Sequence, residues 1–530
     1  MIFRSPFPDV AIPDTALTPF VLRHATRLGD KPALIEGETG RTITYSQLAS
    51  DVERLAVGLA HHGFKQHDVL AIYCQNSPEY IMTLLAVWSL GGAVTTLNPL
   101  FTVREITYQL SDSKPKFLLT APDVLDKASE AARAGGVERI ILFGEAPDTI
   151  AFAQLLQSEG APPPVTIDPR RDVATLLYSS GTTGFPKGVI LSHYNIVANI
   201  CQMAPLARTG EGEVMVVGLP FFHIAAWVIF LHMGLYQGAT IVTLARFELE
   251  RFLRVSQDYH ASRTLLVPPI VLALAKQPIV DQYQLAYKVF LVGAAPLGEA
   301  VARACEQRIG CVIQQVYGLS ETSPATHANP DDPANIKLAS VGPCVPNTEC
   351  KVVDLASGEA LGPNQQGELC MRGPQVMLGY LNRPEATAQV IEPEGWFHSG
   401  DIGYADDDGY FYIVDRVKEL IKYKALQVAP AELEAVLLAH PAVADAAVIP
   451  SPDEEAGEVP KAFVVLKLDA PPDTTPEALM AFVAERVAPY KKIRRLEFIE
   501  QIPKTASGKI LRRLLVERER TARAGQSAVG

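Results

Sequence analysis

The sequence lacks the features that mark exported or membrane-spanning proteins. Its seven cysteines are scattered and never form a C-x-x-C pair, which argues against a disulfide framework or a zinc knuckle and favours the reducing cytoplasm. Prolines and aspartates interrupt the amino-terminal segment MIFRSPFPDVAIPDTALTPF, where a secretory signal needs an unbroken apolar stretch. The charge-free stretch Val214 to Ala245 contains Pro220, two histidines and several glycines, so we expect no integral membrane span.

An excess of positive charge is also missing. Forty-seven Lys plus Arg stand against 59 Asp plus Glu, which gives a net charge of -12. This sign disfavours attraction to phosphate backbones, so we expect no nucleic-acid partner. Apolar residues make up 48% and charged residues 20% of the 530 residues, a balance typical of folded globular proteins and of a chain with more than one domain.

Strand-like and helix-like segments alternate along most of the chain. Runs such as VLAIYC and KVFLVG alternate with stretches of helical period, which predicts an α/β body with mainly parallel sheets. Between Gly342 and Tyr412 the pattern changes to short Gly- and Pro-rich strands, which indicates a β subdomain. A further αβ pattern follows Asp415. We therefore predict a large domain over 1–416 and a small one over 417–530, joined by a solvated hinge, DRVKELIKYK, at 415–424.

The strongest local motif is YSSGTTGFPKG at 178–188. Glycines let the backbone approach an oxyanion, hydroxyls and N–H groups donate to it, and Lys187 adds charge, so the motif predicts a phosphate-binding loop. It is not a Walker loop, because Pro186 precedes the lysine and Gly188 follows it. A simple Ser/Thr/Gly turn is the structural alternative.

Three further clusters carry polar groups suited to a nucleotide. In QVYGLSET, Tyr317 could stack on a purine and Glu321 could hold Mg²⁺, although the tyrosine could equally belong to the core. Asp401 and Arg416 could contact ribose hydroxyls and phosphate, or could be ordinary surface residues. The loop KTASGK could deliver Lys509 to a developing anion, or could simply be solvated.

Taken together, these motifs resemble a known family. YSSGTTGFPKGV, QVYGLSET, WFHSGD, DRVKELIKYK, QVAPAELE and PKTASGK occur in the order and at the spacing typical of the adenylate-forming superfamily of acyl-CoA synthetases, over nearly the whole chain. The segments VPPIVLALAKQPIVDQYQL and GAAPLG look closest to the 4-coumarate:CoA ligase group, which also includes fatty acyl ligases and beetle luciferases. The resemblance implies the adenylate-forming fold with a mobile small domain.

The resemblance implies a ligase with two half-reactions. A carboxylic acid attacks the α-phosphate of ATP to give acyl-AMP and pyrophosphate, and the thiol of coenzyme A then displaces AMP. Glu321 is expected to hold Mg²⁺. The implied ATP and AMP contacts are Ser179, Ser180, Gly181, Thr182, Thr183, Gly184, Lys187, Ala295, Gln315, Tyr317, Ser320, Thr322, Asp401, Arg416, Lys422 and Gln427.

The same resemblance assigns the catalytic and CoA-binding positions. Lys509 is expected to neutralise the adenylation transition state, and His223 to lie between the acyl pocket and the pantetheine channel, although it could be a core histidine. Lys418 falls at the hinge about which the small domain swings. The implied CoA contacts are Arg246, Lys424 and Ala425, with a plain surface charge as the alternative for Arg246.

The implied acyl pocket is apolar. Val316 stands where many relatives carry glycine, and Ala225 and Ile229 replace hydroxyl-bearing residues of the plant 4-coumarate enzymes, so a phenol would lack a partner. We expect an aryl-propenoic acid, preferably unsubstituted, or a medium-chain fatty acid. The implied pocket residues are Ala225, Trp227, Ile229, Gly293, Ala294 and Val316.

Several other functions stay open at this point. The protein could pass its acyl group to an acceptor other than CoA, or could act on long-chain fatty acids. An amino-acid adenylating enzyme would be expected to carry an aspartate where FFHIAAW stands, and a luciferase the pattern HHGF. A non-catalytic nucleotide-binding protein is disfavoured by the joint presence of Lys187, Glu321 and Lys509. The sequence does not determine the oligomeric state.

One departure from the family pattern generates a prediction. Ala425 stands where the family motif YKG-x-Q has glycine, and alanine at a left-handed backbone position costs about 1 kcal/mol. We therefore expect thioester formation to be slower than adenylation, and the Ala425→Gly variant to accelerate the CoA step in stopped-flow assays that start from acyl-AMP. An unchanged rate of that step would reject the idea.

Overall fold

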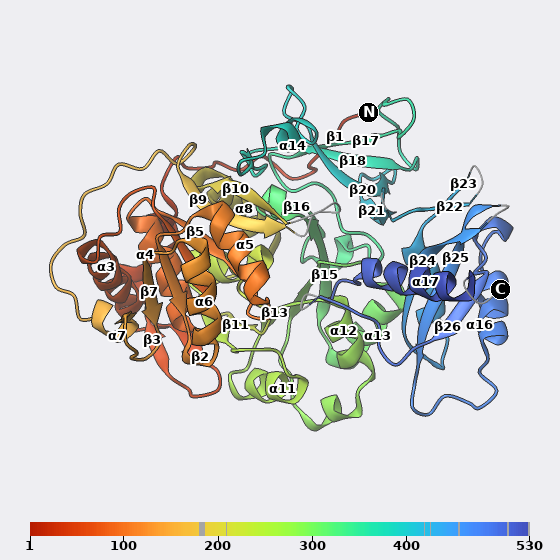
Figure 1. Ribbon diagram of the computed structural model, residues 1–530, viewed down its shortest axis with the longest axis horizontal. Helices are drawn as coiled ribbons and strands as arrows, with labels where there is room; N and C mark the ends of the chain where they lie inside the picture. The colour runs from red at the N-terminus through yellow and green to blue at the C-terminus, as the bar shows by residue number, and fades with distance from the viewer. Residues whose placement is uncertain are drawn as a thin grey trace.

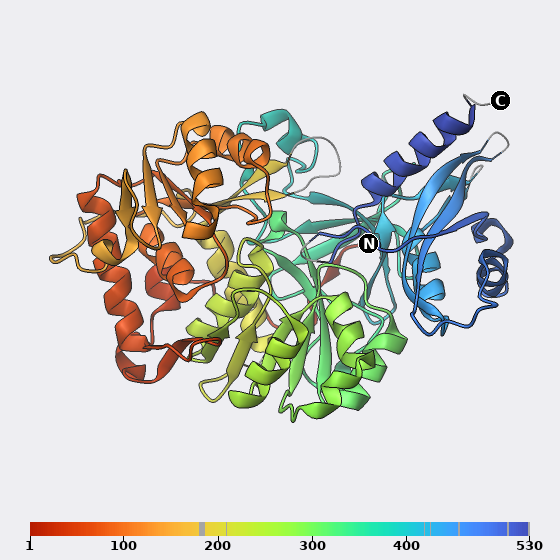
Figure 2. The ribbon, with the colours of Figure 1, turned by 60° about the horizontal axis from the view of Figure 1, so that its bottom comes forward.

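The computed structural model describes residues 1–179, 186–207, 209–417, 419–423, 426–453, 456–505 and 508–527. Two eight-stranded sheets and a five-stranded sheet form the large part of the molecule, and a further five-stranded sheet forms the carboxy-terminal part. In both views the carboxy-terminal part, coloured blue, is a lobe beside the end of the large part (Figures 1 and 2). The α/β architecture with a β subdomain and a small αβ lobe confirms the predicted fold class.

The first eight-stranded sheet holds the predicted phosphate loop at one side. Its order is β19-β10-β9-β5-β4-β6-β7-β8, and the strands from β9 to β8 are parallel, whereas β9, β10 and β19 pair antiparallel. The strands are β4 (Val69–Tyr73), β5 (Ala93–Thr96), β6 (Phe117–Thr120), β7 (Arg139–Leu142), β8 (Thr149–Ala151), β9 (Val173–Ser179), β10 (Lys187–Ser192) and β19 (Gly379–Tyr380). The main helices are α3 (Tyr45–His61), α4 (Pro78–Ser89), α5 (Val103–Ser113), α6 (Leu125–Gly135) and α8 (His193–Ala207).

The second eight-stranded sheet supplies most candidate site residues. Its order is β16-β15-β14-β13-β11-β12-β2-β3, parallel from β15 to β2. Its strands are β2 (Pro32–Glu36), β3 (Thr42–Thr44), β11 (Val214–Val217), β12 (Thr240–Thr243), β13 (Arg263–Leu266), β14 (Val289–Val292), β15 (Val312–Gly318) and β16 (Ala325–Ala328). Its helices include α9 (Ile224–Ala226), α10 (Met233–Tyr236), α11 (Leu249–Asp258), α12 (Pro268–Lys276) and α13 (Glu299–Ile309).

The β subdomain and the carboxy-terminal lobe complete the fold. The subdomain sheet is antiparallel and consists of β1 (Phe3–Arg4), β17 (Glu349–Val353), β18 (Gly367–Arg372), β20 (Phe397–Ala405) and β21 (Phe411–Arg416). The lobe contains β22 (Ile421–Tyr423), β23 (Leu426–Val428), β24 (Val443–Asp453), β25 (Gly457–Leu466), β26 (Arg495–Phe498), α15 (Pro430–Leu438), α16 (Pro476–Ala484) and α17 (Arg512–Ser527). The lobe has hydrophobic clusters of its own, separate from the main core.

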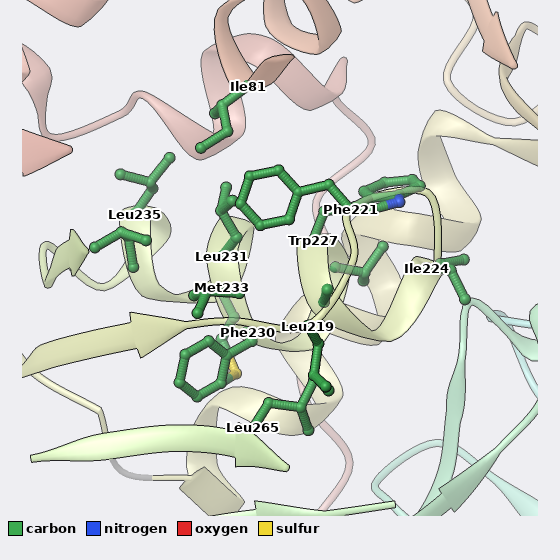
Figure 3. Packing of buried hydrophobic residues seen from close by; sticks show 14 of the residues in the cluster. Ile81, Leu219, Phe221, Ile224, Trp227, Phe230, Leu231, Met233, Leu235 and Leu265 are labelled. Carbon is green, nitrogen blue, oxygen red and sulfur yellow. The ribbon is translucent and has the colours of Figure 1, made fainter. Parts of the chain in front are cut away.

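The charge-free stretch between Val214 and Ala245 folds inside the main core. It forms β11, α9, a π-helical segment over Trp227–His232, α10 and β12. The Trp227 ring packs against Trp88 and His232, with ring centroids 5.6 Å apart in both pairs, among apolar neighbours that include Phe221 and Leu231 (Figure 3). Among the described residues, no helix has the length and apolar character needed to cross a membrane.

The predicted solvated hinge is partly wrong. Asp415, Leu420 and Ile421 are buried. Leu420 packs against Ile402 of β20 and Ala429, and Ile421 lies in strand β22 and in the core of the lobe. The Asp415 carboxylate accepts hydrogen bonds from the backbone N–H groups of Arg416 and Ala431. The charge pattern of the segment thus concealed the short strand β22, which belongs to the sheet of the lobe. Lys418, the predicted hinge residue, and Lys424 lie outside the described residues.

Asn76 ties the two large sheets together and provides a test of the fold. It follows β4 of the first sheet, and its buried amide donates to the carbonyls of Leu219 (2.9 Å) and Leu244 (3.0 Å) and accepts from the N–H of Phe221 (2.7 Å), all three beyond strands of the second sheet. Asn76→Leu leaves these backbone groups without their partner. Each buried group left unsatisfied lowers the free energy of unfolding by about 1–3 kcal/mol. We therefore expect the large part of Asn76→Leu to unfold at a lower midpoint urea concentration than that of the wild-type protein.

The matched control is Asn335→Leu. Among the described residues, this exposed side chain hydrogen-bonds to its neighbour Asp332 alone, so the expected change in unfolding free energy is within about 0.5 kcal/mol. Equal midpoints for Asn76→Leu and the control would contradict the bridging role.

Candidate active site

The carboxyl ends of parallel strands bring distant motifs to one edge of the second sheet. His223 follows β11, the segment Gly293–Ala295 follows β14, and Gln315 and Tyr317 lie near the end of β15. Val292 and Gln315 are register partners on β14 and β15, so the GAAPLG and QVYGLSET motifs are neighbours. Ligands of open α/β sheets bind at this edge, and this makes it the candidate site.

Asp401 is the centre of a buried polar cluster. It is the cross-strand partner of Arg416 on β20 and β21, and its Oδ1 lies 3.1 Å from Arg416 Nε. The hydroxyl of Tyr317 donates to its Oδ2 at 2.6 Å. Burial raises the pKa of Asp401, and Arg416 and the Tyr317 hydrogen bond oppose that rise. Three motifs far apart in the sequence thus meet at one carboxylate.

Glu321 lies beside the predicted phosphate loop. Its Oε1 accepts hydrogen bonds from the Ser179 hydroxyl (2.9 Å) and the Tyr380 hydroxyl (3.0 Å), and Lys187 Nζ stands 4.9 Å from the centre of the Tyr380 ring. Ser179 and Lys187 are register partners on the antiparallel strands β9 and β10, which brings the two ends of the predicted loop together. Among the described residues both hydrogen bonds go to Oε1, which leaves Oε2 to offer a hard cation such as Mg²⁺.

Tyr380 was missed by the sequence analysis. It lies on β19, which pairs antiparallel with β10, and this pairing carries its hydroxyl to Glu321. The signal in the sequence was the GY dipeptide of MLGYLN, in which Gly379 has a positive φ of 149° and precedes the aromatic residue. Nothing in that local pattern identifies a distant glutamate as the partner.

Lys509 reaches the site from the carboxy-terminal lobe. The neighbouring Gly508 has a φ of +81°, and a Cβ on it would lie 3.0 Å from Pro269 Cγ just after β13, so the loop packs directly on the large part. Burial, and then the charge of Arg416, lowers the pKa of Lys509 to about 8. Burial lowers the pKa of His223 to about 4, and the charge of Lys509 adds to this effect. Lys509, Arg416, Asp401 and His223 therefore share one electrostatic environment.

The predicted acyl-pocket residues divide into two groups. A Cβ on Gly293 would lie 3.0 Å from Val316 Cγ2, so these two residues are in contact, and Ala294 beside them is exposed with a φ of +69°. Ala225 is half-buried in α9 near His223, and its N–H donates to His223 Nδ1 at 3.4 Å. Trp227, in contrast, is fully buried in the main core. The side chain of Ile229 is not among those described.

Other predicted residues have clear structural settings. Gln315 donates its amide to the carbonyls of Leu297 and Leu338, and Thr322 caps its own turn through the backbone of Leu319. Ala295 and Ser320 are half-buried in the loops after β14 and β15.

The predicted CoA-binding and hinge residues are only partly placed. Arg246 is exposed after β12, and Lys422 is exposed on β22, where its N–H donates to Glu458 within the lobe. Gln427 is the register partner of Lys422, and its side chain is not described. The predicted positions outside the described residues are Ser180, Gly181, Thr182, Thr183, Gly184, Lys418, Lys424 and Ala425.

Arg512 is a second residue that the sequence analysis missed. It lies three residues after Lys509, at the start of α17, and its guanidinium donates to both carboxylate oxygens of Glu434 (2.8 and 2.7 Å) and forms an ion pair with Glu419. Its Nε also donates to the carbonyl of Val448 at 3.2 Å. These bonds fix the base of the Lys509 loop to the lobe. Two arginines, Arg512 and Arg513, follow GKIL, and the sequence alone does not indicate which of them is buried.

Comparisons with known proteins agree with this site. The family model "AMP-binding enzyme" matches residues 21–381, and the model "AMP-binding enzyme C-terminal domain" matches residues 432–509. The chain is 42% identical to 4-coumarate–CoA ligase 1 of Petroselinum crispum over 97% of this chain and 96% of the relative. It is 41% identical to the 4-coumarate–CoA ligase of Vanilla planifolia, over 97% and 95%.

Solved structures agree with both the fold and the family. ATP-bound MatB from Rhodopseudomonas palustris aligns with a TM-score of 0.85 at 26% identity, over 95% of this chain and 99% of that one. The o-succinylbenzoate CoA synthetase MenE from Bacillus subtilis, in complex with its acyl-adenylate intermediate, aligns with a TM-score of 0.81 at 28% identity, over 94% and 98%. The chain therefore belongs to the family of AMP-binding enzymes and is an AMP-forming acid–thiol ligase.

Proposed function

We propose that this protein activates an apolar carboxylic acid with ATP and transfers the acyl group to coenzyme A, releasing AMP and pyrophosphate. The observation that carries the proposal is the position of Lys509, half-buried and from the small lobe, within the electrostatic reach of Asp401 and Arg416 of the large part. A carboxylate is a poor acyl donor, so activation must precede transfer. The acyl-adenylate supplies AMP as the leaving group.

The adenylation step builds up negative charge at a place where the cluster can stabilise it. We propose that Ser179 and Lys187, with the loop between them, bind the phosphates, and that Tyr317 stacks on the adenine while Asp401 accepts from the ribose hydroxyls. As the acid attacks, negative charge builds on the α-phosphate oxygens, and the ammonium of Lys509 is positioned to stabilise it. Glu321 would hold Mg²⁺, which supplies countercharge to the phosphates when it is bound.

The thioester step needs a different arrangement around the same acyl group. We propose a domain boundary at 416/417 with Lys418 as the hinge, so that rotation of the lobe withdraws Lys509 and brings in the segment Lys422 to Gln427. Strand β21 ends at Arg416 and β22 begins at Ile421, so the proposed boundary lies between two strands. A neutral His223, with its pKa near 4, suits a place between acyl group and thiol. Arg246, Lys424 and Ala425 are the proposed CoA contacts.

The proposed acid is an aryl-propenoate, preferably without a ring hydroxyl, or a medium-chain fatty acid. The 4-coumarate–CoA ligases at 42% and 41% identity support the aryl-propenoate class. Ala225, Gly293 and Val316 have no side-chain group that could hydrogen-bond to a phenol, and the contact of Val316 with Gly293 would narrow the proposed pocket. We also propose a cytoplasmic site of action, because all seven cysteines are buried free thiols and free thiols are typical of a reducing compartment.

The substrate can be tested directly. Purified protein is incubated with ATP, Mg²⁺ and acids from acetate to palmitate plus benzoate, cinnamate and 4-coumarate, with and without CoA, and acyl-AMP and acyl-CoA are measured by mass spectrometry. We expect cinnamate or a medium-chain acid to give the highest kcat/KM, because the pocket lacks a phenol partner. A preference for 4-coumarate would overturn the apolar assignment. Acyl-AMP that accumulates despite CoA would instead indicate another acceptor.

The pKa of Lys509 gives a second prediction. Its ammonium must be charged to stabilise the transition state, and its pKa near 8 means that the charge is present below this pH and is lost as pH rises through it. We expect kcat/KM for acyl-AMP formation to decline above about pH 8. In Lys509→Arg the guanidinium stays charged, so the variant is slower but loses this decline. An identical decline in both proteins would show that another group titrates.

A further inference from the structure

Three side chains with metal-ligand chemistry meet outside the nucleotide site, on the antiparallel sheet of the β subdomain. Glu368 and Cys370 lie two positions apart on β18, so both side chains point to the same face. His398 on β20 is the register partner of Cys370. One ligand atom from each, a carboxylate oxygen, the thiol sulfur and a ring nitrogen, all lie within 4.8 Å of one another. Strands β18 and β20 are neighbours in the upper part of Figure 1.

Two of the separations between these atoms are close to those around a tetrahedral ion, and the third is at most 4.8 Å. His398 Nδ1 lies 3.0 Å from Glu368 Oε2 and 3.4 Å from Cys370 Sγ. In a tetrahedral zinc site, bonds of about 2.0–2.3 Å place neighbouring ligand atoms about 3.3–3.6 Å apart. Little movement is therefore needed for the three atoms to surround one ion.

A second layer of contacts orients the histidine. Its other nitrogen, Nε2, lies 2.8 Å from Glu392 Oε1, and Glu392 is held in turn by Lys351 Nζ at 3.0 Å. A carboxylate on the far nitrogen of a ligating histidine is the usual support of a zinc-bound ring. The thiol is fully buried, whereas Glu368 and His398 are partly exposed, so water can reach a fourth position.

We propose that Glu368, Cys370 and His398 form a binding site for a zinc-class divalent cation, with water as the fourth ligand. On binding, Cys370 gives up its thiol proton and His398 Nδ1 carries no proton, and both protons pass to solvent as the ion takes their place. A thiolate and an imidazole favour zinc and cobalt over Mg²⁺, so this site is chemically distinct from Glu321.

The cation would act on the segment that carries Asp401. The strand pairing shifts between Glu368 and Cys370, because β20 bulges there, with Gly400 at a φ of +70°. The N–H of Gly400 donates to Glu368 Oε1 at 2.9 Å, and the Ser399 hydroxyl donates to the carbonyl of Leu369 at 2.7 Å. An ion bound to Glu368 Oε2 and His398 would therefore link the two strands across the bulge and restrict the movement of the segment that leads to Asp401.

Cobalt titration of the full-length, metal-free protein tests the site. We expect one equivalent of Co²⁺ to give a sulfur-to-cobalt charge-transfer band and the intense visible bands of a tetrahedral ion, with no displacement by excess Mg²⁺. Zn²⁺ should displace the cobalt and raise the midpoint of thermal unfolding. Wild-type protein without a charge-transfer band would overturn the proposal.

Variants assign the signal to these residues. Cys370→Ser should lose the charge-transfer band, and His398→Gln should lose the tetrahedral spectrum. The control Cys305→Ser, which alters a buried free thiol on α13 in the other sheet layer, should keep both. Because Cys370→Ser could unfold the sheet, Glu392→Gln provides an independent variant: it should keep the band but weaken Co²⁺ binding about 10–100-fold. A band that persists in folded Cys370→Ser, or unchanged affinity in Glu392→Gln, would contradict the assignment.

Discussion

A single buried carboxylate organises the site of this ligase. Asp401 is held by Arg416 on the adjacent strand and by the Tyr317 hydroxyl at the end of β15, and Lys509 stands close enough to influence its pKa. A buried carboxylate without partners would be strongly disfavoured, so its cation and hydroxyl partners must be in place together. The cost of burying this charge therefore couples the β subdomain, the second sheet and the small lobe.

This coupling explains why the lobe matters for chemistry. Lys509 belongs to a structural unit with its own hydrophobic clusters, yet its loop packs on Pro269 through Gly508. Arg512 binds Glu434 and Glu419 and fixes the base of that loop inside the lobe. Lys509 therefore belongs to the lobe, and its charge opposes the rise in the pKa of Asp401 across the contact between the two parts. The proposed rotation of the lobe would remove that charge from Asp401 and so separate the two reaction steps.

The sequence predicted the fold class and family because these depend on patterns that are local in the chain. Alternating strand and helix periods predicted the α/β body, and the motifs around Ser179, Tyr317, Asp401 and Lys509 identified the candidate site. Contacts that depend on strand order were not accessible. Tyr380 meets Glu321 only because β19 pairs with β10, and a two-residue strand carries almost no periodic signal.

Burial was the other quantity that the sequence pattern misjudged. The charged segment 415–424 suggested solvent, but Asp415 is buried because backbone N–H groups of Arg416 and Ala431 satisfy its carboxylate. Trp227, expected in the acyl pocket, is fully buried in the main core with its ring against Trp88, and its place in the pocket stays a prediction. An apolar residue in a site motif looks the same whether it faces a ligand or the interior, so only packing separates the two.

The most direct test of the account is acid-dependent exchange of labelled pyrophosphate into ATP in the absence of CoA. If the cluster around Asp401 and Lys509 forms an acyl-adenylate reversibly, exchange requires the carboxylic acid and falls by about 100-fold or more in Lys509→Ala. ATP binding without exchange for any acid in the tested range would contradict the account. Exchange that is equally fast without Lys509 would contradict it as well.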